Sequence, residues 1–237
     1  RVWSIQNRLA PSLELSPYVA DSYTEAYPFT ITPDETVNLT TTFSLYRDHY
    51  EGTEFDLTTG VAAGPFGNPY RNLGPADAHT DFQNESFIEV RPGANPRPVS
   101  AVFCAYSYVA QARADLPDPV GGVLWYGPAV PYETVYAPMY AGAENVSVSY
   151  TTGDREVYDP EAAYWTFDFV TNWAMLRYDA MIVDIQAKQA ELESESIAAV
   201  RTTDATAIEL IQAGDEAGAR QALTTFTVER GDAIIDE

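Results

Sequence analysis

Between Asn84 and about Ser149, this chain of 237 residues has the pattern of a series of short strands. Apolar segments rich in Val, Tyr and Phe are separated by turns that contain Pro or Gly. In places the apolar residues are nearly continuous, which is typical of strands that are covered on both faces. We therefore predict a sheet over residues 84–150 that needs a covering layer.

The following segment has the pattern of a long helix. Asp159 suits the N-cap and Pro160 suits the first helical position. Large apolar residues then recur at spacings of three, four and seven, which predicts one buried side. They are Trp165, Phe169, Trp173, Leu176 and Val183, with Phe167, Met175 and Ile182 widening the stripe. After "RTTDAT" we predict two shorter helices, separated around Gly214 and Gly218, so that residues 159–237 form a helical part.

Residues 1–83 have the pattern of helix and loop segments that lie over a larger body. One helix is predicted here, beginning at Thr32 with Pro33 at its first position and ending at Gly52. Because no clean boundary is visible, we interpret residues 1–237 as a single α+β domain.

The chain is strongly acidic. Its 13 basic and 35 acidic residues give a formal net charge of −22, which repels both phosphate backbones and anionic lipid surfaces. No run approaches the roughly 18 apolar residues of a membrane span. We therefore expect neither nucleic acid nor a membrane as a partner.

Three sequons give a weak indication of location. They begin at Asn38, Asn84 and Asn145, where roughly one would arise by chance, so these asparagines are glycosylation candidates. They favour an extracellular or secretory location, while the single Cys104 can form no internal disulfide and says nothing about the redox compartment. No signal peptide is visible, but the first residues read as the middle of a longer protein.

No complete catalytic motif is visible in the sequence. Asp48 and His49 could form an acid/base pair, but adjacent helical residues point in different directions, which favours a hydrogen-bonded structural histidine. Two histidines and one cysteine do not supply the ligand spacing of a zinc site, and no acidic loop matches an EF-hand. We predict no metal and no cofactor, and we expect Cys104 to be a buried, inert thiol within a strand.

Several long blocks resemble peptidase family C69, a family of dipeptidases. They follow the family's order from Arg1 to about Glu193: "RVWSIQNRLAPSLEL", "YRDHYEGTEFDLTTGVAAGPFGNPYRN", "YSYVAQARADLPDPVGGVLWYGPAVPYETVYAPMYAG" and "SYTTGDREVYDPEAAYWTFDFVTNWAMLRYDAMIVDIQAKQAELE". The resemblance implies an N-terminal-nucleophile hydrolase fold, an αββα sandwich with antiparallel strands at roughly residues 85–150. It also implies dipeptide hydrolysis by a cysteine that begins the mature chain and uses its own α-amino group as the base.

The family's N-terminal half, with its nucleophile, is absent from these residues. We therefore expect no catalytic residue in this chain, and we expect the N-terminal half as a partner, on the same or a separate chain. An alternative is a non-catalytic secreted glycoprotein or fibre subunit built on the same fold. A homo-oligomer is left open.

The resemblance gives candidates for binding an oxyanion or the substrate's carboxylate. They are Arg113, Gln111, Ser107 and Asn172. In a strand, residues 107, 109, 111 and 113 face one way and would form a polar wall. Alternatively, Arg113 pairs with Asp115 or Asp118, and Asn172 makes a structural hydrogen bond. Asp48, His49 and Arg71 are expected to fix the loop of the second block.

This chain departs from the family pattern within the strand itself. It has Tyr108 where the family has His, and Ala110 and Ala112 where the family has Thr and Ser. These differences change the chemistry of the predicted wall.

Overall fold

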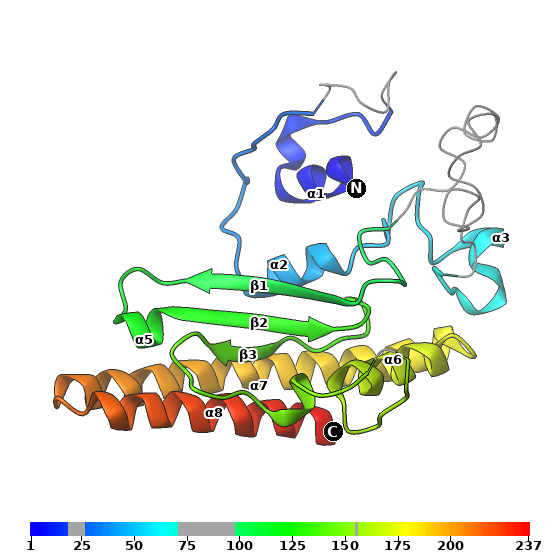
Figure 1. Ribbon diagram of the computed structural model, residues 1–237. Coiled ribbons are helices and arrows are strands. Elements are labelled where there is room, and N and C mark those ends of the chain that lie inside the picture. The colour runs from blue at the N-terminus through cyan, green and yellow to red at the C-terminus, as the bar shows by residue number, and fades with distance from the viewer. Residues whose placement is uncertain (19–26, 71–97, 155) are drawn as a thin grey trace. The chain divides into compact units, whose positions relative to one another are not determined.

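The computed structural model describes residues 1–18, 27–70, 98–154 and 156–237 (Figure 1). The chain divides into two compact units, residues 1–101 and 102–237, and each is described by itself. The interpretation of the chain as a single domain stays a prediction.

The first unit consists of short helices joined by loops. They are α1 (Val2–Leu9), η1 (Pro11–Leu13), α2 (Leu39–Tyr46), α3 (Gly60–Ala63) and η2 (Gly64–Phe66). The predicted helix start at Thr32 is wrong, because Asn38 caps α2 and accepts a hydrogen bond from the Thr41 N–H at 2.9 Å. Asp34 instead accepts hydrogen bonds from Ser12, at 2.9 Å from its backbone N–H and 2.6 Å from its hydroxyl.

The second unit begins with a three-stranded antiparallel sheet in the order β1-β2-β3. The strands are β1 (Tyr106–Ala112), β2 (Gly122–Pro128) and β3 (Ala137–Tyr140), and the short helix α5 (Asp118–Gly121) lies between the first two. Val109 lies opposite Trp125, and Trp125 lies opposite Pro138. The strand predicted for "NVSVSY" is wrong, because Val148–Tyr150 forms the 3-10 helix η3. The strand predicted for "SFIEVRP" lies outside the described residues.

Three helices complete this unit: α6 (Ala163–Ala174), α7 (Tyr178–Gln212) and α8 (Glu216–Asp236). The prediction of one long helix from Asp159 is wrong, because α6 begins only at Ala163 and stops at Ala174. The separate helix α7 then continues through "RTTDAT" for 35 residues in all. There is a single later break, where Gly214 adopts a φ of +82°. Gly218 lies inside α8 and donates its N–H to the capping carboxylate of Asp215 at 2.8 Å.

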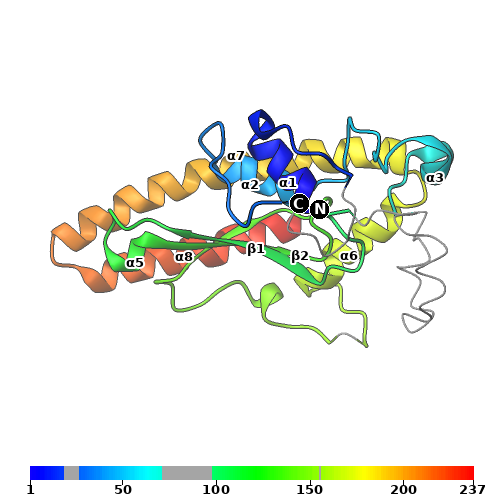
Figure 2. The ribbon, with the colours of Figure 1, turned by 90° about the horizontal axis from the view of Figure 1, so that it is seen from above.

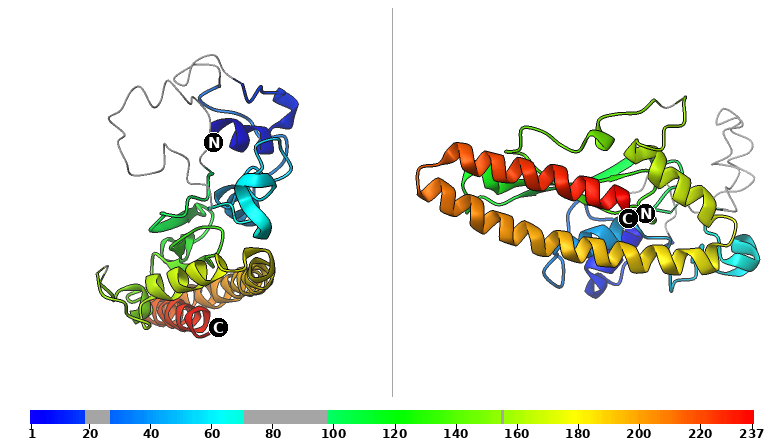
Figure 3. Two further views of the ribbon diagram at one scale, coloured as in Figure 1. Left: turned by 90° about the vertical axis from the view of Figure 1, so that its right-hand side faces the viewer. Right: turned by 90° about the horizontal axis from the view of Figure 1, so that it is seen from below.

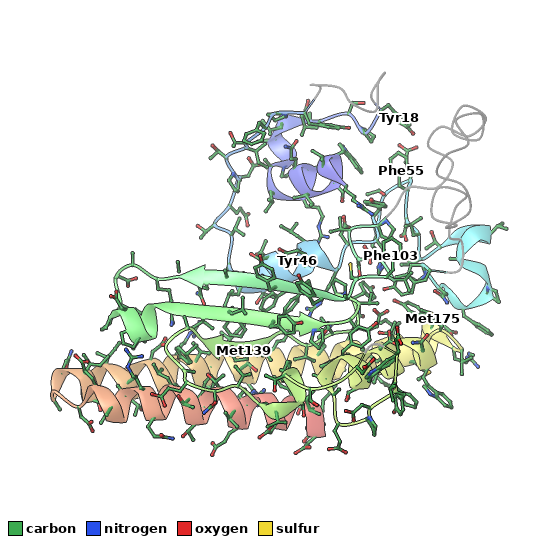
Figure 4. The ribbon with its side chains drawn as sticks, in the orientation of Figure 1. Tyr18, Tyr46, Phe55, Phe103, Met139 and Met175 are labelled. Carbon is green, nitrogen blue, oxygen red and sulfur yellow. The ribbon has the colours of Figure 1, made fainter. Side chains whose placement is uncertain are left out.

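α7 and α8 form a hairpin that covers one side of the sheet. Figure 1 and the right-hand view of Figure 3 show the two helices side by side. Figure 2 shows α6 at the end of this hairpin that is opposite the turn between α7 and α8. The core joins the sheet to all three helices, and Met139, labelled in Figure 4, packs against it. Its buried members are Ala129, Val135, Ala137, Phe167, Leu192 and Ile234.

The apolar stripe predicted to be buried is largely exposed. Phe169 is 47% exposed, Trp173 50%, Leu176 62% and Val183 61%. Phe167, which the sequence placed in the stripe, is buried as predicted, and the other buried residues of α6 are smaller: Ala163, Thr171 and Ala174. The prediction was wrong because α6 uses its small side chains to approach β2 and α7 closely, which leaves its large ones outside.

Candidate functional site

The candidate polar wall lies on β1, where side chains alternate in exposure. Tyr106, Tyr108, Ala110 and Ala112 are exposed, whereas Ser107, Val109 and Gln111 are buried or partly buried. The hydroxyl oxygens of Ser107 and Tyr136 lie 2.7 Å apart. Gln111 Oε1 accepts a hydrogen bond from Trp125 Nε1 at 3.1 Å. The structure therefore brings both predicted polar residues to one side of the sheet, each in contact with an aromatic side chain.

Arg113 follows β1 and is held by a carboxylate. Its Nη1 lies 2.5 Å from Asp204 Oδ2 and its Nη2 3.1 Å from Asp204 Oδ1, so the pair is bidentate. Nη2 also donates to the Val120 carbonyl at 2.5 Å. The partner is Asp204, from the middle of α7, and not Asp115 or Asp118 as the sequence suggested. Both side chains are mostly buried, with 16% and 14% exposed, which makes this pair different from a surface ion pair.

Tyr140 joins this pair from the end of β3. Its hydroxyl lies 2.7 Å from Asp204 Oδ1 and 3.0 Å from the Val200 carbonyl. Burial raises the pKa of Tyr140 well above its usual value, and the hydrogen bond that it donates to Asp204 raises this pKa further. The Nε of Arg113 is buried and has no hydrogen-bond acceptor among the described residues. The arrangement positions a guanidinium at the end of β1 and neutralises its charge.

Asn172 lies on α6, in contact with its own helix. Its Nδ2 donates to the Asp168 carbonyl at 2.8 Å and to Asp168 Oδ2 at 2.9 Å. Burial raises the pKa of Asp168, and the hydrogen bond from Asn172 partly opposes this rise. The structure does not bring Asn172 into contact with Ser107, Gln111 or Arg113 through any hydrogen bond among the described residues.

The second family-like block forms a tightly bonded turn in the first unit. Asp48 is buried and accepts from the Ser4 hydroxyl, from Arg8 Nη1 at 3.1 Å and from the Tyr50 N–H at 3.0 Å. His49 is fully buried, with its Nδ1 3.5 Å from Glu51 Oε1. Burial alone would raise the pKa of Glu51, but hydrogen bonds from His49 and the backbone outweigh it and lower this pKa. Arg71 lies outside the described residues.

The remaining candidates are dispersed. Cys104 is only partly buried and precedes β1, so the expectation of a buried strand thiol is wrong. Asn38 caps α2 and Asn145 is exposed in the loop before η3, whereas Asn84 lies outside the described residues. In the part of the chain that the structure describes, no group of three or more His, Cys, Asp or Glu side chains could hold a metal ion. No helix of this part is both long and apolar enough to cross a bilayer.

Comparison with known proteins supplies what the geometry alone does not. A family model described as "Peptidase family C69" matches residues 1–191. The chain belongs to peptidase family C69. It is 25% identical over 154 residues to a "Probable dipeptidase" of Salmonella dublin, and 25% identical over 198 residues to a "Probable dipeptidase" of Latilactobacillus sakei.

The C69 chain is much shorter than these relatives. The two matches cover 65% and 81% of this chain but only 27% and 33% of the relatives. The family match ends at residue 191, so Asp204 and all of α8 lie beyond it.

Sequence reasoning missed Tyr136, Tyr140 and Asp204 as members of the polar wall. The sequence carries little signal for them. Asp204 falls in "RTTDAT", which has the composition of a linker, and the two tyrosines read as ordinary strand residues. Only the long-range packing of α7 on β3 brings them to Arg113.

Proposed function

We propose that this chain is part of a cysteine-type dipeptidase that hydrolyses the amide bond of short peptides. The observation that carries the proposal is the C69 match over residues 1–191, together with two relatives named as probable dipeptidases. In this proposal the nucleophile is a cysteine at the start of the mature protein, outside these 237 residues.

The proposed architecture is the αββα sandwich of the N-terminal-nucleophile hydrolases. The second unit supports it with an antiparallel sheet and a helical hairpin on one side, which correspond to one β layer and one α layer. The other two layers would come from the rest of the longer protein, in its N-terminal half.

The chemistry follows from a cysteine at a chain start. Its α-amino group takes the thiol proton and the thiolate attacks the carbonyl carbon. The α-ammonium group then gives this proton to the amide nitrogen, and the amine leaves as the thioester forms. Water then hydrolyses the thioester. The developing oxyanion in both steps needs fixed N–H donors.

The residues of this chain would support that site from one wall. Ser107 and Gln111 are held by Tyr136 and Trp125, and Arg113 is held by Asp204. Because its charge is already neutralised, Arg113 would position the end of β1 and would bind the substrate's carboxylate only if Asp204 moved away. The remaining candidate, Asn172, is bonded to Asp168 of its own helix and would contribute only by stabilising α6.

The test is to express the complete reading frame of the gene and to assay the purified protein on a panel of dipeptides. We expect hydrolysis that is abolished by iodoacetamide, and N-terminal sequencing should give a cysteine at the start of a mature chain. The matched control is Cys104→Ser, which should keep the activity and its sensitivity to iodoacetamide. A mature protein with no cysteine at any chain start would refute the proposal, as would loss of activity in Cys104→Ser with the fold intact.

A further inference from the structure

Helix α6 is apolar on two opposite sides. One side, with Ala163, Phe167, Thr171 and Ala174, is buried against its own unit. The other carries large side chains that recur every three or four positions and therefore lie on one side of the helix. These are Trp165, Phe169, Trp173 and Leu176, the last just beyond the helix end.

The rings of this side form a connected set with Tyr158, in which Trp165 is partly buried and the others are exposed. The ring of Tyr158 lies 5.9 Å from Trp165 and 6.4 Å from Phe169, and Phe169 lies 5.7 Å from Trp173. Tyr158 is 55% exposed and Leu176 is 62% exposed. We name the five residues the aromatic stripe. Contiguous exposed apolar patches mark interaction sites.

We propose that the aromatic stripe is the surface on which the rest of the longer C69 polypeptide packs. The inference rests on the proposed function in one respect, which is that this chain works within a longer protein. The length of chain outside the structure supports this occupant, because the matched segments make up only 27% and 33% of the two relatives. The stripe also lies wholly within the family match at residues 1–191.

Charge argues against a second copy of this chain as the occupant. Each copy carries a formal net charge of −22, so two copies repel each other when they approach. The five residues of the stripe carry no charge of their own, and the neighbouring Arg177 is already paired with Asp179. An apolar surface from the remaining polypeptide meets neither obstacle.

The test uses the protein expressed from its complete reading frame, with the photo-crosslinking substitution Trp173→p-benzoylphenylalanine. After irradiation, mass spectrometry identifies the residue joined to position 173. We expect a cross-link to a residue outside positions 1–237. The matched control places the same group at Glu209, an exposed polar position of α7 close to its turn with α8, and should give no such product.

Every other result at position 173 overturns the inference. A cross-link to residues 1–101 would show that the first unit covers the stripe. A cross-link between two copies would show that the stripe is a dimer surface. The absence of any product would show that the stripe is exposed to solvent. The assay on dipeptides is independent of this outcome. An inactive protein with the expected cross-link would refute the proposed function alone, and an active protein without it would refute the inference alone.

A second measurement does not depend on the cross-linker. In the 237-residue chain, the triple variant Phe169→Gln, Trp173→Gln, Leu176→Gln should keep its circular dichroism spectrum and lose part of its fluorescence with the dye 8-anilinonaphthalene-1-sulfonate. In the complete protein, the same variant should show a lowered melting temperature, because the covered surface has become polar. The control variant Val148→Gln, Val157→Gln changes two exposed residues outside the stripe and should do neither. Equal melting temperatures for the complete protein and its triple variant would contradict the inference.

Discussion

Helix α6 and the α7–α8 hairpin both follow the sheet in the chain, yet they contribute to its core in opposite ways. α6 is rich in aromatic residues and leaves most of them exposed. The hairpin has a weaker apolar pattern but supplies much of the core. Besides Leu192, Leu223 and Ile234, it buries polar residues: Gln189, Glu193, Ser196, Thr224 and Thr227.

The buried polar residues of the hairpin have specific partners. Gln189 Nε2 donates to the carbonyls of Tyr132 and Thr134, at 3.1 and 2.6 Å. Glu193 Oε1 accepts from the Tyr136 N–H at 3.0 Å, and Thr227 Oγ1 accepts from the Tyr140 N–H at 3.2 Å. The hairpin thus satisfies backbone groups around β3 that would otherwise be buried without partners. The comparison teaches that hydrophobicity along a helix does not by itself say which helix completes the core.

The largest expected effect comes from breaking the ion pair between the hairpin and the sheet. Asp204→Ala leaves the guanidinium of Arg113 buried without its carboxylate, which costs about 3–5 kcal/mol in the free energy of unfolding. Urea denaturation of the 237-residue chain measures this. The exposed pair of Lys188 and Glu237 gives the control, and Lys188→Ala should change the unfolding midpoint little. Similar midpoints for both variants would show that the buried pair does not stabilise the hairpin.

Two leucines test the comparison directly with the same substitution. Leu223→Ala in α8 removes a fully buried side chain and should cost about 2–5 kcal/mol. Leu176→Ala, at the end of α6, removes a side chain that is 62% exposed and should change the stability of the 237-residue chain by less than about 0.5 kcal/mol. Thermal melts of the two variants provide the measurement. If both substitutions lower the stability of the chain by the same amount, α6 and the hairpin do not differ as described.

A polar core position should give an intermediate effect. Gln189→Leu keeps the size of the side chain but removes the donor to one buried and one partly buried carbonyl, so we expect a loss of about 1–3 kcal/mol in unfolding free energy. Gln221→Leu on the exposed part of α8 is the control, and its effect should be small. A Gln189→Leu variant more stable than the parent would mean that the hydrogen bonds contribute nothing net.

The substitution with the smallest expected effect at neutral pH is Tyr140→Phe, and its effect should become visible in alkaline solution. The folded state raises the pKa of Tyr140 above its unfolded value of about 10, so the folded state binds this proton more tightly. The stability that depends on Tyr140 is therefore complete below about pH 10 and is lost as the pH rises further. Denaturation at a series of alkaline pH values should show a steeper loss for the parent chain than for Tyr140→Phe. Identical slopes would contradict the assignment.

The sequence predicted the parts of the fold that local chemistry determines. The strands around Val109 and Trp125, the alternation along β1 and the helical C-terminal part follow from residue type and spacing. The start of α2 could have been found at Asn38, a good N-cap, but Thr32 and Pro33 gave an equally good local signal. Local rules could not choose between them, because the choice depends on Asp34 binding Ser12 from a distant segment.

The candidate site was less predictable for a related reason. Ser107, Gln111 and Arg113 were found because they stand on one strand, whereas Asp204 is separated from Arg113 by 91 positions. Burial of α6 was wrongly predicted because periodicity identifies an apolar side and says nothing about what lies opposite it. The four large residues of that side satisfy the helical period, but the sheet receives the smaller ones.

The position of Asp204 has a practical consequence for anyone who shortens this protein. A fragment cut at residue 191, where the family match ends, would keep Arg113 and lose the anion that neutralises it. It would also lose Leu223 and Thr227, so the guanidinium would stand beside an opened core. In the intact chain Asp204 occupies this cation, so any carboxylate affinity measured with such a fragment would describe the cut and not the protein.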